Sequence, residues 1–255
     1  MIFFRKVMLS YYKFLVHNPN TLITRFFGLY SIRLAETNLE VHFIVMENIC
    51  PDDQPIEARY DLKGSTHGRS AGAHERHKKN PLLKDLDFKR RLLLGPARRH
   101  IFLTQLNKDS RWLADHNIMD YSVLLCISNP VKQQSAASSS GVKSNTTALA
   151  KMAANVGRLS VFKSEYGGGF GSTDEQDRKY HEVYYMGVID ILQSYNLRKK
   201  LETKFKGVFA STPESISCVD PLTYFNRFNK YFEKITGADG SRLSSDWTMI
   251  QTTQQ

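Results

Sequence analysis

Two aspartates lie at the ends of apolar segments, where a carboxylate could do chemistry. Asp120 lies where a polar helix end meets an apolar run in NIMDYSVLL, and Asp190 ends the apolar run of MGVIDIL. Enzymes often place proton acceptors and metal ligands at strand ends beside a cleft. From these residues alone, each aspartate could equally be a helix cap or a strand terminator. The sequence therefore indicates two candidates for catalysis or metal binding, with a structural role as the alternative.

Residues 59–111 carry a one-sided positive charge. They include fourteen basic and five acidic residues, for a net charge of +9. Solvated surfaces usually mix both signs of charge, so this excess favours an anionic surface or ligand as partner. A basic face without a specific partner is the alternative. The basic residues are Arg59, Lys63, Arg69, Arg76, Lys78, Lys79, Lys84, Lys89, Arg90, Arg91, Arg98, Arg99, Lys108 and Arg111.

A glycine-rich segment, GGGFG at residues 167–171, is a further candidate for binding phosphate. It fits neither GxGxxG nor the Walker pattern, and no lysine-bearing strand follows it, so we expect a flexible linker. The segment lies within residues 131–180, which are too rich in small and polar residues to offset the cost of chain ordering. Because apolar segments flank this stretch, we expect 131–180 to be a mostly disordered insert within one domain.

The elements that must position these residues follow from the periodicity of apolar side chains. A helix over residues 2–16 ends at Asn18-Pro19, because the position before proline disfavours helix. The mixture of patterns along the chain predicts an α+β fold. We expect strands at residues 25–34, 41–49, 58–64, 119–127 and 182–192, and further helices at 97–115 and 221–235.

Composition excludes several classes of protein. With 255 residues, of which 41% are hydrophobic and 11% aromatic, the chain can bury a core and is neither wholly disordered, nor collagen, nor a coiled coil. Cys50, Cys126 and Cys218 are too few and too far apart for a disulfide framework, so we expect a reducing intracellular compartment. No apolar run approaches the roughly 18 residues that span a bilayer, and no signal peptide is recognisable. The net charge of +10 predicts an anionic partner.

Five motifs resemble those of the phosphatidylinositol phosphate kinases and occur in that family's order. The resemblance as a whole covers nearly all of the chain outside residues 131–180 and the last twenty residues. The resemblance implies a phosphatidylinositol phosphate kinase fold, distantly related to protein kinases, with most of the C-terminal lobe and part of the N-terminal lobe. The motifs are HNPNTLITRFFGLY (17–30), YDLKGST (60–66), DSRWLADHNIMDYSVLL (109–125), YYMGVIDILQSYNLRKKLE (184–202) and CVDPLTYFNRFNKYF (218–232).

The resemblance implies roles for three charged residues. Lys63 of DLKGS looks like a cation near the transferred phosphate. Asp120 of IMDYS resembles the catalytic-loop aspartate that orients the inositol hydroxyl and could deprotonate it. Asp190 of VID resembles the aspartate that holds magnesium, the counterpart of the DFG residue of protein kinases. Phosphoryl transfer depends mainly on positioning and charge neutralisation, so these residue types suit it.

The same resemblance implies a nucleotide site. Met46, Glu47 and Asn48 correspond to the hinge, where backbone groups would bind adenine. The implied cofactors are ATP and Mg²⁺.

Residues 191–217 correspond to the family's activation, or specificity, segment. Five cations surround the single acid Glu202 there, and interleaved apolar residues could enter the interfacial layer of a membrane. A solvated loop is the alternative interpretation. The cations are Arg198, Lys199, Lys200, Lys204 and Lys206.

Glu202 bears on the lipid substrate. In the family, a glutamate two places after the paired lysines resembles the 5-kinases, and an alanine there resembles the 4-kinases. Lys199 and Lys200 are followed by Leu201 and then Glu202. The resemblance therefore implies phosphatidylinositol 4-phosphate as acceptor, phosphorylated at the 5-hydroxyl to give phosphatidylinositol 4,5-bisphosphate. A phosphatidylinositol 5-phosphate 4-kinase is the alternative.

Two features depart from the family pattern. MDYSVLLCI places Cys126 where the family has a glycine. The chain also begins within the helix that should follow the nucleotide-binding strands, so we expect residues 1–255 to form a single lipid-kinase catalytic domain without its glycine-rich strands. Such a chain would be a fragment or a degenerate kinase, and a catalytically dead phosphoinositide-binding module is an alternative function.

The expected partners are a phosphoinositide lipid and an anionic membrane surface, with a homodimer left open. We expect a cytoplasmic protein, peripheral on the cytosolic face of a membrane, the plasma membrane being the expected one. No nucleic acid is expected, because the chain lacks a zinc-finger pattern, an aromatic RNA-binding signature and a clear helix-turn-helix.

Overall fold

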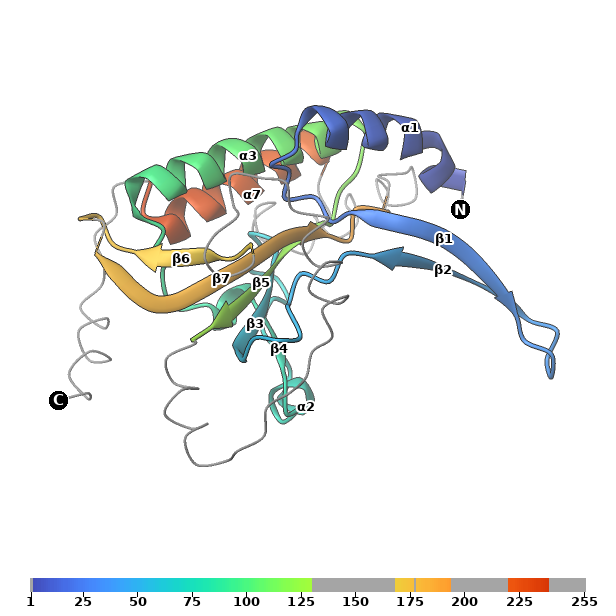
Figure 1. Ribbon diagram of the computed structural model, residues 1–255, viewed down its shortest axis with the longest axis horizontal. Coiled ribbons are helices and arrows are strands. Elements are labelled where there is room, and N and C mark those ends of the chain that lie inside the picture. The colour runs from blue at the N-terminus through green and yellow to red at the C-terminus, as the bar shows by residue number, and fades with distance from the viewer. Residues whose placement is uncertain (1, 130–167, 177, 194–219, 239–255) are drawn as a thin grey trace.

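The structure is a computed structural model that describes residues 2–129, 168–176, 178–193 and 220–238 (Figure 1). Its main sheet has the strand order β4-β3-β5-β7-β6, with β3 and β4 parallel and the other neighbours antiparallel. The central strands are buried on both faces, as their apolar sequences require. The strands are β3 (Ile56–Leu62), β4 (Leu82–Lys84), β5 (Ser122–Ser128), β6 (Phe170–Thr173) and β7 (Lys179–Ile189).

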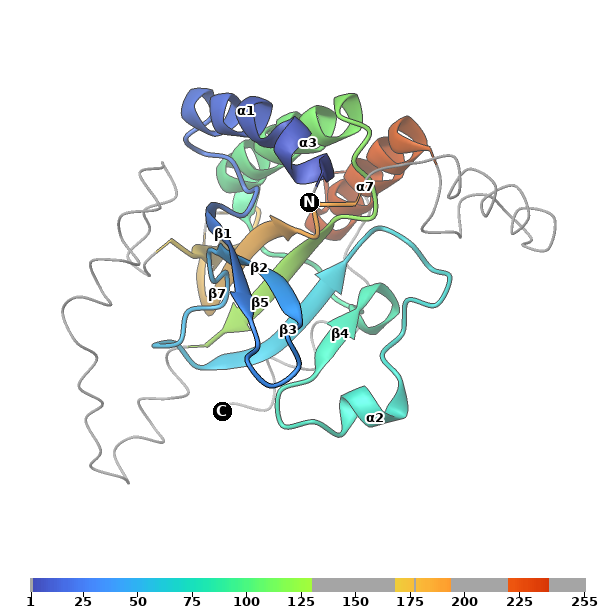
Figure 2. The ribbon, with the colours of Figure 1, turned by 90° about the vertical axis from the view of Figure 1, so that its right-hand side faces the viewer.

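Long helices cover one face of this sheet. Figures 1 and 2 show α3 (Gly95–Asp115) and α7 (Pro221–Thr236) side by side on that face, with α1 (Ile2–His17) next to α3. The α7 helix begins where the Asp220 carboxylate accepts hydrogen bonds from two backbone N–H groups of its first turn, and it ends at Gly237 with φ 78°. The α1 helix packs against α3 through Phe14 and Trp112, whose rings stack 5.1 Å apart.

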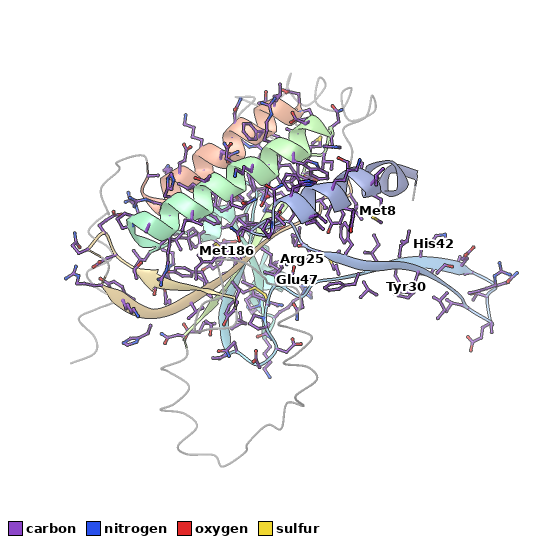
Figure 3. The ribbon with its side chains drawn as sticks, turned by 45° about the horizontal axis from the view of Figure 1, so that its top comes forward. Met8, Arg25, Tyr30, His42, Glu47 and Met186 are labelled. Carbon is purple, nitrogen blue, oxygen red and sulfur yellow. A yellow bond between two sulfur atoms is a disulfide. The ribbon has the colours of Figure 1, made fainter. Side chains whose placement is uncertain are left out.

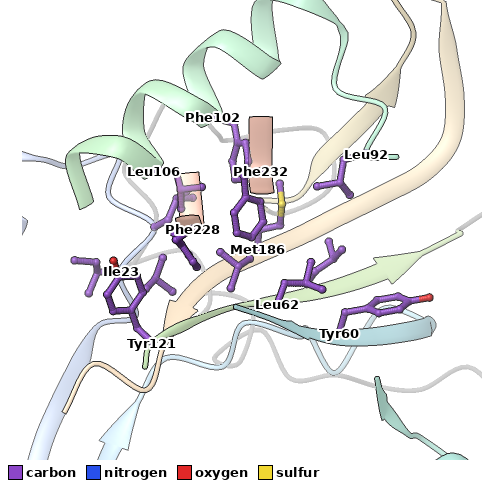
Figure 4. Packing of buried hydrophobic residues seen from close by; sticks show 14 of the residues in the cluster. Ile23, Tyr60, Leu62, Leu92, Phe102, Leu106, Tyr121, Met186, Phe228 and Phe232 are labelled. Atoms are coloured by element: carbon purple, nitrogen blue, oxygen red, sulfur yellow. The ribbon is translucent and has the colours of Figure 1, made fainter. Parts of the chain in front are cut away.

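The core lies between these helices and the sheet. Figure 4 shows Phe102, Phe228 and Phe232 of the helices beside Met186 and Tyr121 from the sheet side, and all five are buried. Phe102 and Phe232 meet edge to face at 5.9 Å, a geometry that aromatic pairs favour. The predicted closing helix is confirmed, and its aromatic residues Tyr224, Phe228 and Phe232 are buried in the core.

Two further strands form a hairpin that projects away from the main sheet (Figures 1 and 3). They are β1 (Phe26–Arg33) and β2 (Glu40–Met46), paired antiparallel. Opposite each other on one face lie Tyr30 with Phe43 and Ile32 with Val41, and all four side chains are exposed. The hairpin therefore presents an apolar face that no described residue covers.

Shorter elements lie between β3 and α3. They are the helix α2 (Ala73–Arg76) and the 3₁₀ turn η1 (Asp85–Asp87), which directly follows β4.

The structure confirms the expected helices and strands, with ends that differ by a few residues. It contradicts the expected extent of the insert, because β6 and the start of β7 lie within residues 131–180. The linker expected at 167–171 is also wrong for its described part, since Phe170 is buried in β6 against Phe102. Gly169 leaves no room for a side chain, because a Cβ there would come 2.4 Å from a methyl carbon of Val183. Residues 130–167 lie outside the described part of the chain.

The cysteines also differ from expectation. Cys50 and Cys126 form a disulfide, with Cα atoms 5.8 Å apart and 76 residues apart in sequence. Their separation along the chain did not predict whether they could pair. Cys126 lies in β5 and Cys50 in the loop that follows β2, and the fold brings the two together. The expectation that the cysteines lie too far apart to pair is therefore wrong for Cys50 and Cys126. Cys218 lies outside the described residues.

A buried carboxylate joins α3 to the chain that leads into β1. Asp109 accepts hydrogen bonds from the Thr21 hydroxyl at 2.8 Å, the Leu22 backbone N–H at 2.7 Å and the Gln105 amide at 2.8 Å. Burial raises the pKa of Asp109 from 3.8 to about 7, although these hydrogen bonds and the charge of Lys108 oppose the rise.

We predict that Asp109 makes stability depend on pH. Its pKa is higher in the folded than in the unfolded chain, so the folded state binds more protons between about pH 4 and pH 7. The free energy of unfolding that Asp109 contributes should fall as pH rises through this interval, by at most about 1.4 kcal/mol per pH unit, and level off above it. Urea unfolding from pH 4 to pH 8 should show this slope in the difference between wild type and Asp109→Asn. Parallel stability curves for the two proteins would contradict the assignment.

Candidate active site

The register of three strands brings the candidate charged residues to one edge of the sheet. Leu62 of β3 pairs with Val123 of β5, and Ser122 of β5 pairs with Ile189 of β7. Lys63 follows the first strand, Asp120 precedes the second and Asp190 follows the third. Antiparallel pairing therefore places all three beside one another, although they are separated by up to 127 positions in the sequence.

Lys63 and Asp120 form an ion pair. The Lys63 Nζ atom lies 3.1 Å from Asp120 Oδ1, with the two side chains 11% and 24% exposed. Asp120 has φ 64°, a left-handed conformation that non-glycine residues rarely adopt and that is common at functional sites. The pair is accessible from one side, so an incoming hydroxyl could reach Asp120 while Lys63 holds the carboxylate in place.

Asp190 shares this electrostatic environment. It also has a left-handed backbone, with φ 63°. Burial raises the pKa of Asp190 above its ordinary value, Lys63 lowers it, and the charges of Asp61 and Asp120 raise it further. The charges of Asp61 and Asp120 therefore oppose a negative charge on Asp190, and the charge of Lys63 favours it.

A cavity of about 180 Å³ opens beside Asp190. Most of its lining residues are apolar, and they include Ile189 at the end of β7, so the cavity suits a flat apolar ring that carries a charged substituent. Its lining residues are Thr24, Phe26, Met46, Ile189, Asp190, Ile191, Leu192 and Gln193.

Of the three hinge residues expected to bind adenine, only Met46 lines this cavity. Glu47 pairs with Arg25, with side-chain N and O atoms 3.6 Å apart, and its backbone N–H donates to the Arg25 carbonyl (Figure 3). Asn48 donates to Asp52 and accepts from the backbone N–H of Cys50. Glu47 and Asn48 therefore stabilise the base of the hairpin. Thr24 and Phe26 also line the cavity, and the sequence did not indicate either of them.

Asp190 is the described carboxylate that could serve as a ligand of a metal ion at this cavity. Within the described residues, no group of three or more histidine, cysteine, aspartate or glutamate side chains could hold a metal ion. Mg²⁺ typically binds one or two protein carboxylates and completes its shell with water and substrate phosphates. Asp190, which lines the cavity, is a single carboxylate of the type that such a site uses.

The basic residues of 59–111 are less one-sided in space than in sequence. At least seven of the fourteen form ion pairs with residues that the structure describes, and several of the acidic partners come from outside this segment, such as Asp120, Glu175 and Glu182. Much of the local excess of charge is therefore neutralised within the fold. The seven are Lys63, Arg69, Arg76, Lys78, Arg90, Arg99 and Arg111.

The expected membrane-binding residues Arg198, Lys199, Lys200, Glu202, Lys204 and Lys206 lie outside the described part of the chain. In the part that is described, no helix combines the length and apolar character needed to cross a bilayer.

Comparison with known proteins finds relatives over most of the chain. A family model described as "Phosphatidylinositol-4-phosphate 5-Kinase" matches residues 1–235. A probable phosphatidylinositol phosphate kinase of Dictyostelium discoideum is 32% identical over 91% of this chain and 37% of its own length. The phosphatidylinositol 4-phosphate 5-kinase its3 of Schizosaccharomyces pombe has the same identity and coverage. The human phosphatidylinositol 4-phosphate 5-kinase type-1 beta is 32% identical over 94% of this chain and 48% of its own length.

The relatives are thus kinases of phosphoinositide lipids. This chain belongs to the phosphatidylinositol 4-phosphate 5-kinase family, as the match over residues 1–235 shows. It spans between about a third and a half of the length of these relatives. The mixed α and β architecture is consistent with the phosphatidylinositol phosphate kinase fold.

The turn that follows Lys63 lies against α7. Gly64 has φ +66°, and a Cβ there would come 2.9 Å from the Tyr231 Cβ and 3.3 Å from the Phe228 Cα. Gly68 has the same φ, but nothing lies within 4 Å of a Cβ at that position. Gly64 therefore meets both a conformational and a packing requirement, and Gly68 only the first.

We predict that Gly64→Ala destabilises the protein more than Gly68→Ala does. Both changes place a side chain in a left-handed conformation, at a cost of about 1–2 kcal/mol. Only the first also forces α7 away from the turn, which should add about 1–3 kcal/mol. Urea unfolding of both variants measures the difference. Equal decreases in the free energy of unfolding for the two variants would show that α7 does not pack tightly on the Lys63 turn.

Proposed function

We propose that this protein transfers the γ-phosphate of ATP to a phosphatidylinositol monophosphate. The observation that carries the proposal is the convergence of Lys63, Asp120 and Asp190 at one sheet edge, beside a cavity with apolar walls. Two carboxylates and a lysine are the residue types that phosphoryl transfer needs for positioning and charge neutralisation. Family membership supports the same chemistry.

The cavity residues, Asp190, Asp120 and Lys63 each have a different proposed role. The cavity receives adenine between Phe26, Met46 and Ile191, which directs the phosphates towards Asp190. Asp190 would hold Mg²⁺, which would neutralise phosphate charge when bound. Asp120 accepts a hydrogen bond from the attacking inositol hydroxyl and orients it, and it can take up the hydroxyl proton. Lys63, 3.1 Å from Asp120, contributes a positive charge beside the transferred phosphate.

The acceptor we propose is phosphatidylinositol 4-phosphate, with phosphatidylinositol 4,5-bisphosphate as product. Two of the relatives are named phosphatidylinositol 4-phosphate 5-kinases. Glu202 is the residue type that resembles the 5-kinases at its position. A phosphatidylinositol 5-phosphate 4-kinase is the alternative within the family.

We further propose that the protein works as a peripheral protein on the cytosolic face of a membrane. Arg198, Lys199, Lys200, Lys204 and Lys206 place five cations within nine residues. A basic residue near an anionic bilayer contributes about 1 kcal/mol of binding, so the group supplies enough attraction to hold the substrate-binding edge at the lipid surface.

The proposal predicts that both aspartates are essential in the catalytically competent protein. Asp190→Asn weakens the metal ligand, and Asp120→Asn removes the proton acceptor, so each should lower kcat by about 100-fold or more. Asp115→Asn makes the same change of charge at the exposed end of α3 and should leave kcat unchanged. Radiolabelled phosphate transfer to phosphatidylinositol 4-phosphate in vesicles measures the effect.

The outcomes of this assay separate the alternatives. Losses of only a few-fold in a folded Asp190 or Asp120 variant would remove that residue from its role. Binding of phosphoinositide vesicles without any turnover by the wild type would favour a non-catalytic binding module.

A second prediction concerns the acceptor. Wild type should phosphorylate phosphatidylinositol 4-phosphate faster than phosphatidylinositol 5-phosphate, and Glu202→Ala should reduce this preference by about 10-fold or more. The physical reason is that a lone carboxylate among cations favours one orientation of the inositol ring. Glu233→Ala, an equivalent change on the exposed surface of α7, is the control. A wild-type preference for the 5-phosphate would overturn the assignment of substrate and leave family membership intact.

A further inference from the structure

Asp85 is a buried carboxylate next to the Lys63 turn, and the roles proposed above do not use it. Its side chain is only 3% exposed. It follows β4, whose last residue Lys84 pairs with Asp61 of β3. Because β3 and β4 run parallel, Asp85 lies level with the end of β3, where the chain turns from Leu62 into Lys63.

The carboxylate occupies a ring of backbone N–H groups. Asp85 Oδ1 accepts hydrogen bonds from the backbone N–H groups of Lys63 at 2.9 Å, Gly64 at 2.7 Å and Ser65 at 3.4 Å. Three successive N–H groups can point at one anion because Gly64 adopts φ +66°. Such rings often bind phosphate in other proteins, but here a side chain of the protein fills the ring.

The other carboxylate oxygen binds Arg69. Asp85 Oδ2 accepts from Arg69 Nε at 2.6 Å, and Arg69 Nη2 also donates to Asp61 Oδ1 at 3.1 Å. Burial lowers the pKa of Arg69, but its bonds to these two carboxylates raise it further, so the net shift is upward. The backbone N–H of Leu86 donates to the Arg69 carbonyl at 2.8 Å, which closes the link between the turn and η1.

The turn held in this way carries the lysine of the site. The Lys63 backbone is held by Asp85, and its Nζ atom reaches 3.1 Å to Asp120. A displacement of the turn would move Nζ relative to Asp120, and displacements of about 1 Å in a catalytic group can cost about 100-fold in rate. We propose that Asp85 is a positioning residue that holds Lys63 in reach of Asp120 and of the transferred phosphate, an inference that rests on the proposed kinase function.

Asp85 fills the ring of N–H groups, and this also bears on how the nucleotide phosphates are bound. The N–H groups of residues 63–65 already donate to Asp85, so they do not bind the nucleotide phosphates. The Lys63 turn contributes to phosphate binding through its side chain. Asp85 is thus an internal substitute for the anion that this backbone shape would otherwise attract.

The test compares Asp85→Asn with Asp174→Asn. Asp174 is a matched control, because it also accepts from two backbone N–H groups and from an arginine Nε at 2.6 Å, yet it lies at the turn between β6 and β7. The substitution Asp85→Asn removes the negative charge of the side chain. It also places an N–H group opposite the Nε donor of Arg69, where the carboxylate oxygen accepted a hydrogen bond. Arg69 keeps Asp61 as a partner, so the variant should fold.

The first measurement does not depend on turnover. Lysine acylation by an N-hydroxysuccinimide ester, followed by mass spectrometry of peptides, reports how well each amine is protected. Acylation of Lys63 should be several-fold faster in Asp85→Asn than in wild type, with the other lysines unchanged, and Asp174→Asn should match wild type. Unchanged acylation of Lys63 in Asp85→Asn would overturn the proposal. Faster acylation of all lysines would also overturn it, because it would show a general loss of structure.

The second measurement is a double-mutant cycle on kcat with Lys63→Met. Asp85→Asn should lower kcat by about 10- to 100-fold with little change in the KM for ATP, but by less than about twofold when Lys63 is already methionine. If Asp85→Asn lowers kcat by the same factor in the wild type and in Lys63→Met, Asp85 does not act through Lys63. If Asp85→Asn does not fold, Asp85→Glu keeps the charge and moves the carboxylate by one methylene, and the same two outcomes apply. A wild type without lipid kinase activity would refute the proposed function, and the acylation result would still decide the positioning role.

Discussion

One register of backbone pairing determines where the chemistry can occur. The β3, β5 and β7 strands are aligned so that Leu62, Val123 and Val188 lie in one row across the sheet. A slip of one residue in either pairing would turn every side chain of a strand to the opposite face. For β5 it would move Val123, Leu125 and Ile127 out of the main core, and it would separate the charged residues at the strand ends. The apolar core therefore also holds the site together, because the side chains that β5 and β7 contribute to it favour this register.

The chain reverses sharply where these strands end, and left-handed residues make the reversals possible. Asp120 and Asp190 both have φ near +60°, and Gly64 has a similar value in the turn after β3. Conformations of this kind cost free energy and persist only when surrounding contacts determine them. The α7 helix provides part of that support, since the Tyr224 hydroxyl donates to the carbonyl of Tyr121, next to Asp120. Packing thus stabilises backbone shapes that the residues would not adopt alone.

The sequence predicted what depends on local pattern and missed what depends on pairing between distant segments. Runs of apolar residues located the strands that carry Asp120 and Asp190, and helical spacing of aromatic residues located α7. Asp85, Arg69 and the Cys50–Cys126 disulfide gave no local signal, because their partners are brought together only by the strand order of the sheet. The glycine-rich part of the insert misled for the opposite reason: its composition is that of a linker, but Phe170 finds a place in the core that composition does not reveal.

The apolar face of the β1–β2 hairpin has a practical consequence for work with this chain. Tyr30, Ile32, Val41 and Phe43 are exposed together on a ribbon of two strands, an arrangement that promotes association between molecules and adhesion to surfaces. Such adhesion needs no phosphoinositide and no charge. Experiments with vesicles should therefore include neutral lipid and a range of salt concentrations, since attraction by basic residues weakens with salt and hydrophobic adhesion does not.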